Sequence, residues 1–112
     1  MVVNYTPDRG DVVWLNFDPQ AGHEQGRIRP ALVLSPVKYN KPAELCIVCP
    51  ITSRTKGYPY EVPMPEGLEI SGVILADQVK SMDWKVRNAE FICSIPEEIL
   101  ENVMQKLETL LF

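Results

Sequence analysis

The sequence lacks the residues on which most hydrolytic and metal-dependent active sites depend. It contains one histidine, His23, and no acidic residue is evidently placed to orient that ring, so neither a Ser-His-Asp nor a Cys-His arrangement is expected. It has no glycine-rich loop of the kind that cradles a phosphate, and no residue cluster with the spacing of metal ligands. We therefore predict that the protein uses no metal or other cofactor, and that His23 is a surface residue.

Cysteine is also scarce, with three residues, an odd number that argues against a disulfide framework. Cys46 and Cys49 have the spacing of some redox and zinc sites. They lie in a β-like run, however, where residues three apart point to opposite faces. No second pair completes a zinc site, and the helix N-terminus that lowers the pKa of a redox thiol is missing. Cys46, Cys49 and Cys93 are therefore interpreted as buried structural residues.

Long apolar runs are absent as well. The longest, residues 45–51, is far shorter than the ~20 residues that a membrane-spanning helix needs. Residues 1–7 have neither the basic start nor the apolar centre of a signal peptide. With 112 residues, 46% of them apolar and 23% charged, the sequence predicts one globular domain over residues 1–112, located in the cytoplasm and without a membrane segment.

Charge is distributed unevenly along the chain. The net charge is −4, which argues against a general nucleic-acid coat protein. Residues 19–60 nevertheless carry six basic and two acidic side chains, whereas residues 61–112 carry four basic and ten acidic ones. A basic middle segment is compatible with a local phosphate-binding site and equally with a solvated loop surface.

Short β-like runs separated by proline and glycine account for most of the chain. Strands are expected at 12–17, 30–35 and 45–51, the last two buried on both faces because no polar residue alternates in them. Residues 36–44 contain several turn-forming residues and predict a long hairpin connection. Further short strands are expected near residues 58–62 and at 72–75, 84–86 and 90–93.

The C-terminal residues predict a helix. Ser94 and Glu97 match a capping box, and Pro96 is tolerated in a first helical turn. An apolar stripe with helical spacing follows, with Glu101, Lys106 and Glu108 on the opposite side. The stripe consists of Ile99, Val103, Leu107 and Leu110, joined by Leu100, Met104 and Leu111. The expected fold class is mainly β with a C-terminal helix, arranged as a small, partly open barrel.

The hairpin formed by residues 30–35 and 45–51 predicts a pairing register. If the hairpin is symmetric about the midpoint between Asn40 and Lys41, residues whose numbers sum to 81 face one another. Arg29 then lies opposite Thr52, with both side chains on one face. A slip of one residue would move the two side chains to opposite faces.

Arg29 also stands where the polar loop of residues 22–28 meets a buried strand, so its side chain can be held firmly and still reach solvent. Arginine and hydroxyl groups suit a phosphate-like anion, because a guanidinium binds phosphate oxygens in pairs. A nearby carboxylate such as Glu24 can accept a proton. The candidate neighbours of Glu24, Arg29 and Thr52 are Arg27, Arg54, Lys56, Asp77, Gln78 and Lys80.

Seven segments of the sequence form a pattern that is far more specific than any one of them alone. They are Gly10-Asp11-Val12-Val13-Trp14, Phe17-Asp18-Pro19, Gly22-His23-Glu24-Gln25, Arg29-Pro30-Ala31-Leu32-Val33-Leu34-Ser35-Pro36, Pro50-Ile51-Thr52, Lys56-Gly57-Tyr58-Pro59 and Leu75-Ala76-Asp77-Gln78-Val79-Lys80-Ser81. With these segments the sequence resembles, along its whole length, the MazF/PemK family of toxin endoribonucleases.

The resemblance implies an SH3-like barrel, usually a homodimer, that cuts single-stranded RNA without a metal and leaves 2′,3′-cyclic phosphate and 5′-hydroxyl ends. It matches the family's catalytic arginine and threonine to Arg29 and Thr52, and its acidic loop residue to Glu24. Two roles remain open for Glu24, that of a proton acceptor and that of a salt-bridge partner of Arg29. The resemblance also implies a cognate antitoxin, which we expect to present an acidic segment.

Two other functions are compatible with the same fold. A gyrase poison of the CcdB type depends in its family on a Trp-Gly-Ile ending, whereas this chain ends with Leu110, Leu111 and Phe112. A non-catalytic SH3-like interaction module has no use for Glu24, Arg29 and Thr52 as a group. We therefore favour the endoribonuclease. Tyr58, Tyr60 and Trp84 are candidates for stacking on RNA bases, although packing in the core is the more common role of such rings.

Overall fold

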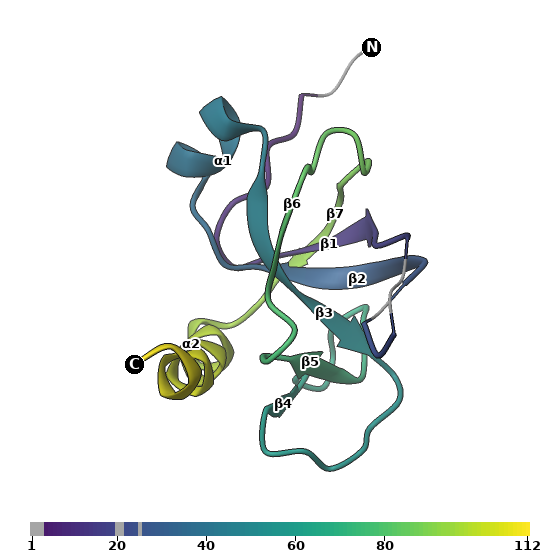
Figure 1. The fold of residues 1–112 in the computed structure, drawn as a ribbon, viewed down its shortest axis with the longest axis vertical. Coiled ribbons are helices and arrows are strands. Elements are labelled where there is room, and N and C mark those ends of the chain that lie inside the picture. Colours follow the sequence, from purple (N-terminus) through teal and green to yellow (C-terminus); the bar gives the residue numbers. More distant parts are fainter. Residues whose placement is uncertain (1–3, 20–21, 25) are drawn as a thin grey trace.

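A computed structural model describes residues 4–19, 22–24 and 26–112, so Gln20, Ala21 and Gln25 of the predicted polar loop lie outside the described residues. The strands in it are β1 (Asp11–Asn16), β2 (Ile28–Val33), β3 (Cys46–Thr52), β4 (Glu61–Pro63), β5 (Val73–Leu75), β6 (Lys80–Met82) and β7 (Glu90–Ser94). The helices are α1 (Val37–Ala43) and α2 (Glu97–Leu111) (Figure 1). The prediction of a mainly β fold with a C-terminal helix is confirmed.

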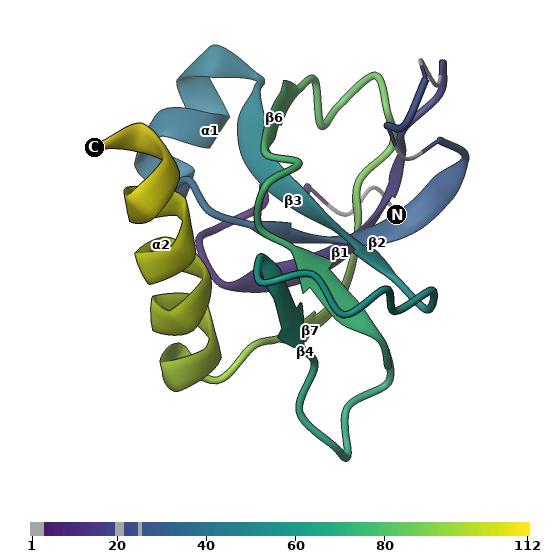
Figure 2. The ribbon, with the colours of Figure 1, turned by 60° about the horizontal axis from the view of Figure 1, so that its bottom comes forward.

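The strands form one antiparallel sheet that curls without closing. Their order is β4-β5-β3-β2-β1-β7, and β6 pairs with the beginning of β3. The sheet buries side chains on both faces, because α2 lies along one of them (Figure 2) and the segments around Tyr5, Met82 and Trp84 cover the other. We call these the α2 face and the opposite face.

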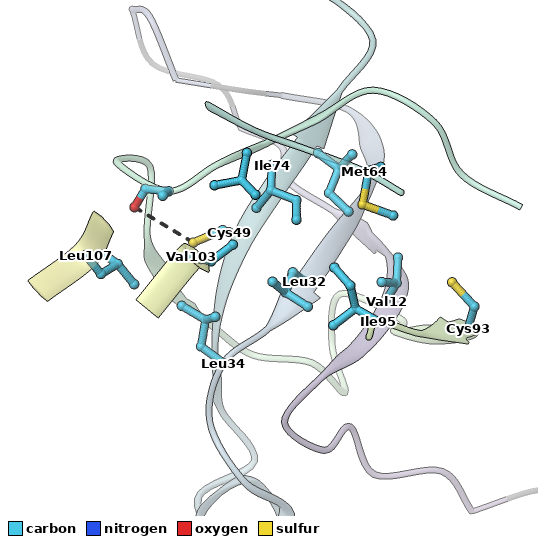
Figure 3. Packing of buried hydrophobic residues seen from close by; sticks show 13 residues of the cluster. Val12, Leu32, Leu34, Cys49, Met64, Ile74, Cys93, Ile95, Val103 and Leu107 are labelled. Atoms are coloured by element: carbon cyan, nitrogen blue, oxygen red, sulfur yellow. Dashed lines mark hydrogen bonds between the residues drawn. The ribbon is translucent and has the colours of Figure 1, made fainter. Parts of the chain in front are cut away.

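Alternation along the strands assigns apolar side chains to the two faces in turn. Val103 and Leu107 of α2 pack with the α2-face residues Leu32, Leu34 and Cys49 (Figure 3). The opposite face buries Val13, Leu15, Phe17, Ala31, Val33, Cys46, Val48 and Met82. The prediction that residues 31–34 are buried on both faces is confirmed, whereas Ile47 in β3 is 37% exposed.

The connection between β2 and β3 is a helix and not the extended turn region predicted for residues 36–44. Helix α1 begins after Pro36, and its Asn40, read in the sequence as a turn former, is fully buried. The side-chain NH2 of Asn40 donates hydrogen bonds to the backbone carbonyls of Pro7 and Ser35, and the backbone carbonyl of Asn40 accepts one from the indole N–H of Trp84. This polar network fixes α1 against the sheet.

The predicted register of β2 and β3 is confirmed despite the intervening helix. Ala31 pairs with Pro50, Leu32 with Cys49 and Val33 with Val48, so the residue numbers in each pair sum to 81. The two buried strands therefore align about the predicted midpoint, because the register depends on the strands and their burial more than on the form of the connection.

Three other local predictions are wrong. Residues 84–86 lie in a turn, because the Trp84 side chain is held by Asn40, and β6 takes the place of the predicted strand. Ser94 ends β7 and does not cap α2, whose N-cap is Pro96 without a side-chain hydrogen bond. In the apolar stripe of α2, Met104, Leu110 and Leu111 are exposed: Val103 and Leu107 are the buried positions of the helix, and Leu110 and Leu111 follow the second of them.

The cysteines have the structural role predicted for them. All three thiols are free and buried, with Cys46 on the opposite face and Cys49 on the α2 face. Burial raises the pKa of both Cys46 and Cys49 to about 12, so both are protonated at neutral pH and are poor nucleophiles and metal ligands. No helix in the described part of the chain is long and apolar enough to cross a membrane.

Candidate active site

Arg29 and Thr52 lie at adjoining ends of β2 and β3. Continuing the Ala31–Pro50 pairing by two residues places Arg29 opposite Thr52, with both side chains directed to the opposite face. Thr52 is the last residue of β3 and is 4% exposed, whereas Arg29 is half-buried. The continued register therefore brings a cationic and a hydroxyl side chain to the same end of the sheet, where its buried strands give way to loops.

One end of the Arg29 side chain is anchored to the loop that precedes β2. Its Nε donates a hydrogen bond of 2.6 Å to the carbonyl of Gly26. Among residues 4–19, 22–24 and 26–112, the Gly26 carbonyl is the only hydrogen-bond partner of the guanidinium. The two terminal nitrogens are thus available to an anion, and their fork geometry suits two oxygens of one phosphate.

Thr52 is held by its backbone on the side of β5. It pairs with Val73, and the preceding Gly72 approaches so closely that an added Cβ atom would lie 2.3 Å from the Thr52 carbonyl oxygen. The Thr52 hydroxyl accepts a hydrogen bond of 3.2 Å from the backbone N–H of Arg54. Its own proton remains available for donation to a bound oxygen.

Glu24 is paired with Lys80 and not with Arg29. The distance between Glu24 Oε1 and Lys80 Nζ is 3.6 Å. Lys80 pairs with Val48 in the sheet, so its side chain lies on the opposite face with those of Arg29 and Thr52. The salt bridge between Glu24 and Arg29, one of the two sequence-based alternatives, is not formed. His23, next to Glu24, is exposed as predicted.

The remaining predicted site residues lie on the segments that flank this group. Arg27 is exposed, and its backbone is fixed by hydrogen bonds with Asp18 and Phe17. Arg54 and Lys56 are exposed in the loop that follows Thr52, whereas Asp77 and Gln78 precede Lys80. The structure thus gathers positive charge on the loops that adjoin Arg29 and Thr52.

Of the three aromatic candidates, one is freely accessible. Trp84 belongs to the packing of the opposite face, where its indole is bonded to Asn40. Tyr60 is half-buried, whereas Tyr58 is 56% exposed with the ammonium of Lys56 5.8 Å from its ring centre. Tyr58 is therefore the aromatic side chain that is best placed to stack on a base.

Two features of this region were not predicted from the sequence. The close approach of Gly72 to Thr52 is a tertiary contact, for which a lone glycine before a short strand is the only sequence signal. A hollow of about 240 Å³ is lined in part by Trp14, Ile28 and Val86. The exposed Trp14 between two buried residues of β1 is consistent with strand alternation.

The group as a whole suits chemistry at a phosphodiester. It combines a guanidinium, a hydroxyl donor and a carboxylate that is balanced by an ammonium group. In the described part of the chain, no group of three or more histidine, cysteine or acidic side chains is placed to hold a metal ion. A guanidinium, a hydroxyl and a carboxylate are suited to charge stabilisation and proton transfer by side chains.

Comparisons with known proteins show which proteins this chain resembles. The family model for PemK-like, MazF-like toxins of type II toxin-antitoxin systems matches residues 8–111. The endoribonuclease toxin MazF of Escherichia coli strain K12 is 45% identical over 111 residues, which cover 99% of each chain. The endoribonuclease PemK of Escherichia coli is 34% identical, over 93% of this chain and 81% of that protein.

Solved structures give the same result for the fold. The crystal structure of MazF from Deinococcus radiodurans superposes with a TM-score of 0.94 at 56% identity, covering 96% of this chain and 98% of that one. A MazE–MazF crystal structure from the same organism matches with a TM-score of 0.88 at 56% identity, over 96% and 97% of the two chains.

Proposed function

Because the chain belongs to the family of PemK-like, MazF-like toxins of type II toxin-antitoxin systems, we propose that it is a toxin endoribonuclease that cuts single-stranded RNA at specific sequences without a metal ion. The observation that supports the proposal is the register of β2 and β3, which, continued two residues beyond the Ala31–Pro50 pair, sets Arg29 opposite Thr52. The Glu24 carboxylate, paired with Lys80, is the proton acceptor that we propose for this site.

RNA supplies the nucleophile for this reaction. The 2′-hydroxyl attacks the adjacent phosphorus, its proton passes to a base, and a pentacovalent phosphorane forms. The bond to the 5′-oxygen then breaks and that oxygen takes up a proton, which leaves a 2′,3′-cyclic phosphate and a 5′-hydroxyl. The protein needs only to align the attack, move the protons and stabilise the negative charge of the phosphorane.

We assign the stabilisation of charge to Arg29 and Thr52. A guanidinium has a pKa above ~12 and is not a base in proteins, so Arg29 acts by binding phosphoryl oxygens. The Thr52 hydroxyl donates a hydrogen bond to one of these oxygens. Glu24 is the candidate base for the 2′-hydroxyl, since its side chain is 49% exposed and can reach an incoming ligand.

The surrounding residues form the proposed RNA-binding surface. Arg27, Arg54 and Lys56 are exposed cations suited to phosphates, whereas Lys80, predicted in the same group, is only 28% exposed and faces Glu24. Asp77 and Gln78 offer an acceptor and an amide to the edges of unpaired bases. As the family resemblance implies, we further propose one functional domain over residues 1–112, a homodimer, and action in the cytoplasm, where such a toxin meets mRNA.

The direct test of this function is cleavage in the presence of a chelator. Purified protein incubated with a long single-stranded RNA in excess EDTA is expected to cut it, because the proposed roles belong to side chains. Mass spectrometry of the fragments should find 5′-hydroxyl and cyclic phosphate ends. Loss of all activity in EDTA, or fragments with 5′-phosphate ends, would contradict the proposed mechanism.

We also propose that a cognate antitoxin inhibits the toxin with an acidic segment that covers the basic surface of residues 27–56. Inhibition is expected to weaken as the salt concentration rises, because charge attraction guides the encounter and is screened by ions. Titrating the antitoxin against cleavage at several salt concentrations measures this effect. An inhibition constant that does not change with salt would exclude the electrostatic part of the proposal.

A further inference from the structure

Lys80 is placed to act on another residue of the site and not on RNA directly. It is the first residue of β6, and its backbone is fixed by pairing with Val48 of β3. Its side chain is 28% exposed and lies on the same face as those of Arg29 and Thr52. Its ammonium already faces the carboxylate of Glu24 at 3.6 Å.

The hydrogen bonds that fix the loop of Glu24 lie at residues 26 and 27, so a separate partner is needed to hold the Glu24 side chain. The hydrogen bonds from Arg29 Nε to the Gly26 carbonyl and from the Arg27 N–H to Asp18 hold the backbone at residues 26 and 27. Neither involves the Glu24 side chain. Among the residues that the structure describes, Lys80 is the only one that pairs with the Glu24 carboxylate.

A carboxylate next to bound RNA also faces an electrostatic problem. The phosphodiester is an anion, and its approach to an unpaired carboxylate would be repulsive. An ammonium group on the far side of the carboxylate offsets this repulsion and holds the carboxylate in place. If Lys80 moved to a phosphate instead, Glu24 would lose its counter-charge at the moment when the second anion arrives.

From this geometry we propose that Lys80 is a positioning residue, which holds the Glu24 carboxylate beside the Arg29–Thr52 pair and affects cleavage through Glu24. The proposal rests on the proposed endoribonuclease function. An ion pair this exposed contributes little to stability, so the loss of Lys80 affects the rate of cleavage and not folding. We expect Lys80→Gln to slow the single-turnover rate roughly 10-fold, since a small misplacement of a reacting group is costly.

A double-mutant cycle with Glu24 separates this role from direct contact with RNA. We expect Lys80→Gln to slow wild-type protein but to cause no further loss when Glu24→Gln is already present. The slope of RNA affinity against salt should not change, whereas a lost phosphate contact lowers that slope by about one. Lys56→Gln is the matched control, for which we expect a lower salt slope and an equal loss with or without Glu24→Gln. Lys80→Arg keeps the charge and should restore part of the rate.

Hydrogen exchange gives a readout that does not depend on activity. Peptides that cover residues 17–28 should exchange faster in Lys80→Gln than in wild type or Lys56→Gln, and an unchanged rate would refute the positioning role. The positioning role would also be overturned if Lys80→Gln and Glu24→Gln slowed cleavage independently and Lys80→Gln lowered the salt slope, or if Lys80→Gln cut RNA at the wild-type rate. If the wild-type protein does not cut RNA, the proposed function fails, and hydrogen exchange still shows whether Lys80 holds the loop.

Discussion

Replacing Arg29 with alanine is expected to slow the cleavage step by a factor on the order of 10²–10³, the usual cost of losing one donor to a developing oxyanion. The terminal nitrogens of Arg29 are not engaged by the described residues, and Thr52, opposite Arg29 in the continued register of β2 and β3, offers a second donor. Affinity for RNA should change far less, because a contact made mainly in the transition state adds little to ground-state binding. Single-turnover rates with separately measured affinities test this expectation.

Arg29→Lys is the matched variant. It keeps the positive charge but loses the planar fork, and a lysine cannot both donate to the Gly26 carbonyl and bind two phosphate oxygens in the same geometry. We expect it to recover only part of the rate lost in Arg29→Ala. A full recovery would mean that charge alone is required, and wild-type cleavage by Arg29→Ala would refute the assignment of Arg29 to the active site.

Gly72→Ala is expected to have the second large effect, although Gly72 carries no functional group. Its φ is +120°, and the new Cβ would lie 2.3 Å from the carbonyl oxygen of Thr52 and 2.9 Å from its carbonyl carbon. Both are backbone atoms, so β3 and β5 must move apart where they hold Thr52. We expect a lower free energy of unfolding and a cleavage rate lowered by about 10² or more, since active-site geometry tolerates little displacement.

Gly67→Ala is the control for Gly72→Ala. Gly67 also has a positive φ, +90°, but an added Cβ meets nothing within 4 Å. It therefore carries the cost of the left-handed backbone, about 1–2 kcal/mol, without the collision. Thermal unfolding and single-turnover cleavage of both variants separate the two causes. If Gly72→Ala were as stable and as active as Gly67→Ala, the close approach would have no role in holding Thr52.

The register at the active site was predictable from the sequence because two uninterrupted apolar runs define β2 and β3. Their midpoint alone placed Arg29 opposite Thr52, and the pairing of Leu32 with Cys49 confirms that register. Helix α1 was not predictable in the same way. Proline and asparagine are typical of turns. The burial of Asn40 is stabilised by hydrogen bonds with Pro7, Ser35 and Trp84, all of which lie outside α1.

The partners of the site residues were harder to predict than the residues themselves. Lys80 lies on a strand of three residues, too short to show an apolar pattern, and its pairing with Glu24 depends on how that strand meets β3. The contact between Gly72 and Thr52 likewise arises from the packing of β5. Sequence patterns indicate which chemical groups are present, whereas tertiary structure decides which of them meet.

Arg29 and Thr52 are proposed to form one cleavage centre, and a double-mutant cycle between them measures whether they act as a unit. Single-turnover rates are measured on one short RNA for wild type, Arg29→Ala, Thr52→Ala and the double variant. We predict a large loss in each single variant and a double variant that is about as slow as the slower of the two, because residues that act as a unit are strongly non-additive. A double variant whose loss equals the product of the single losses, or a single variant with the wild-type rate, would contradict the claim.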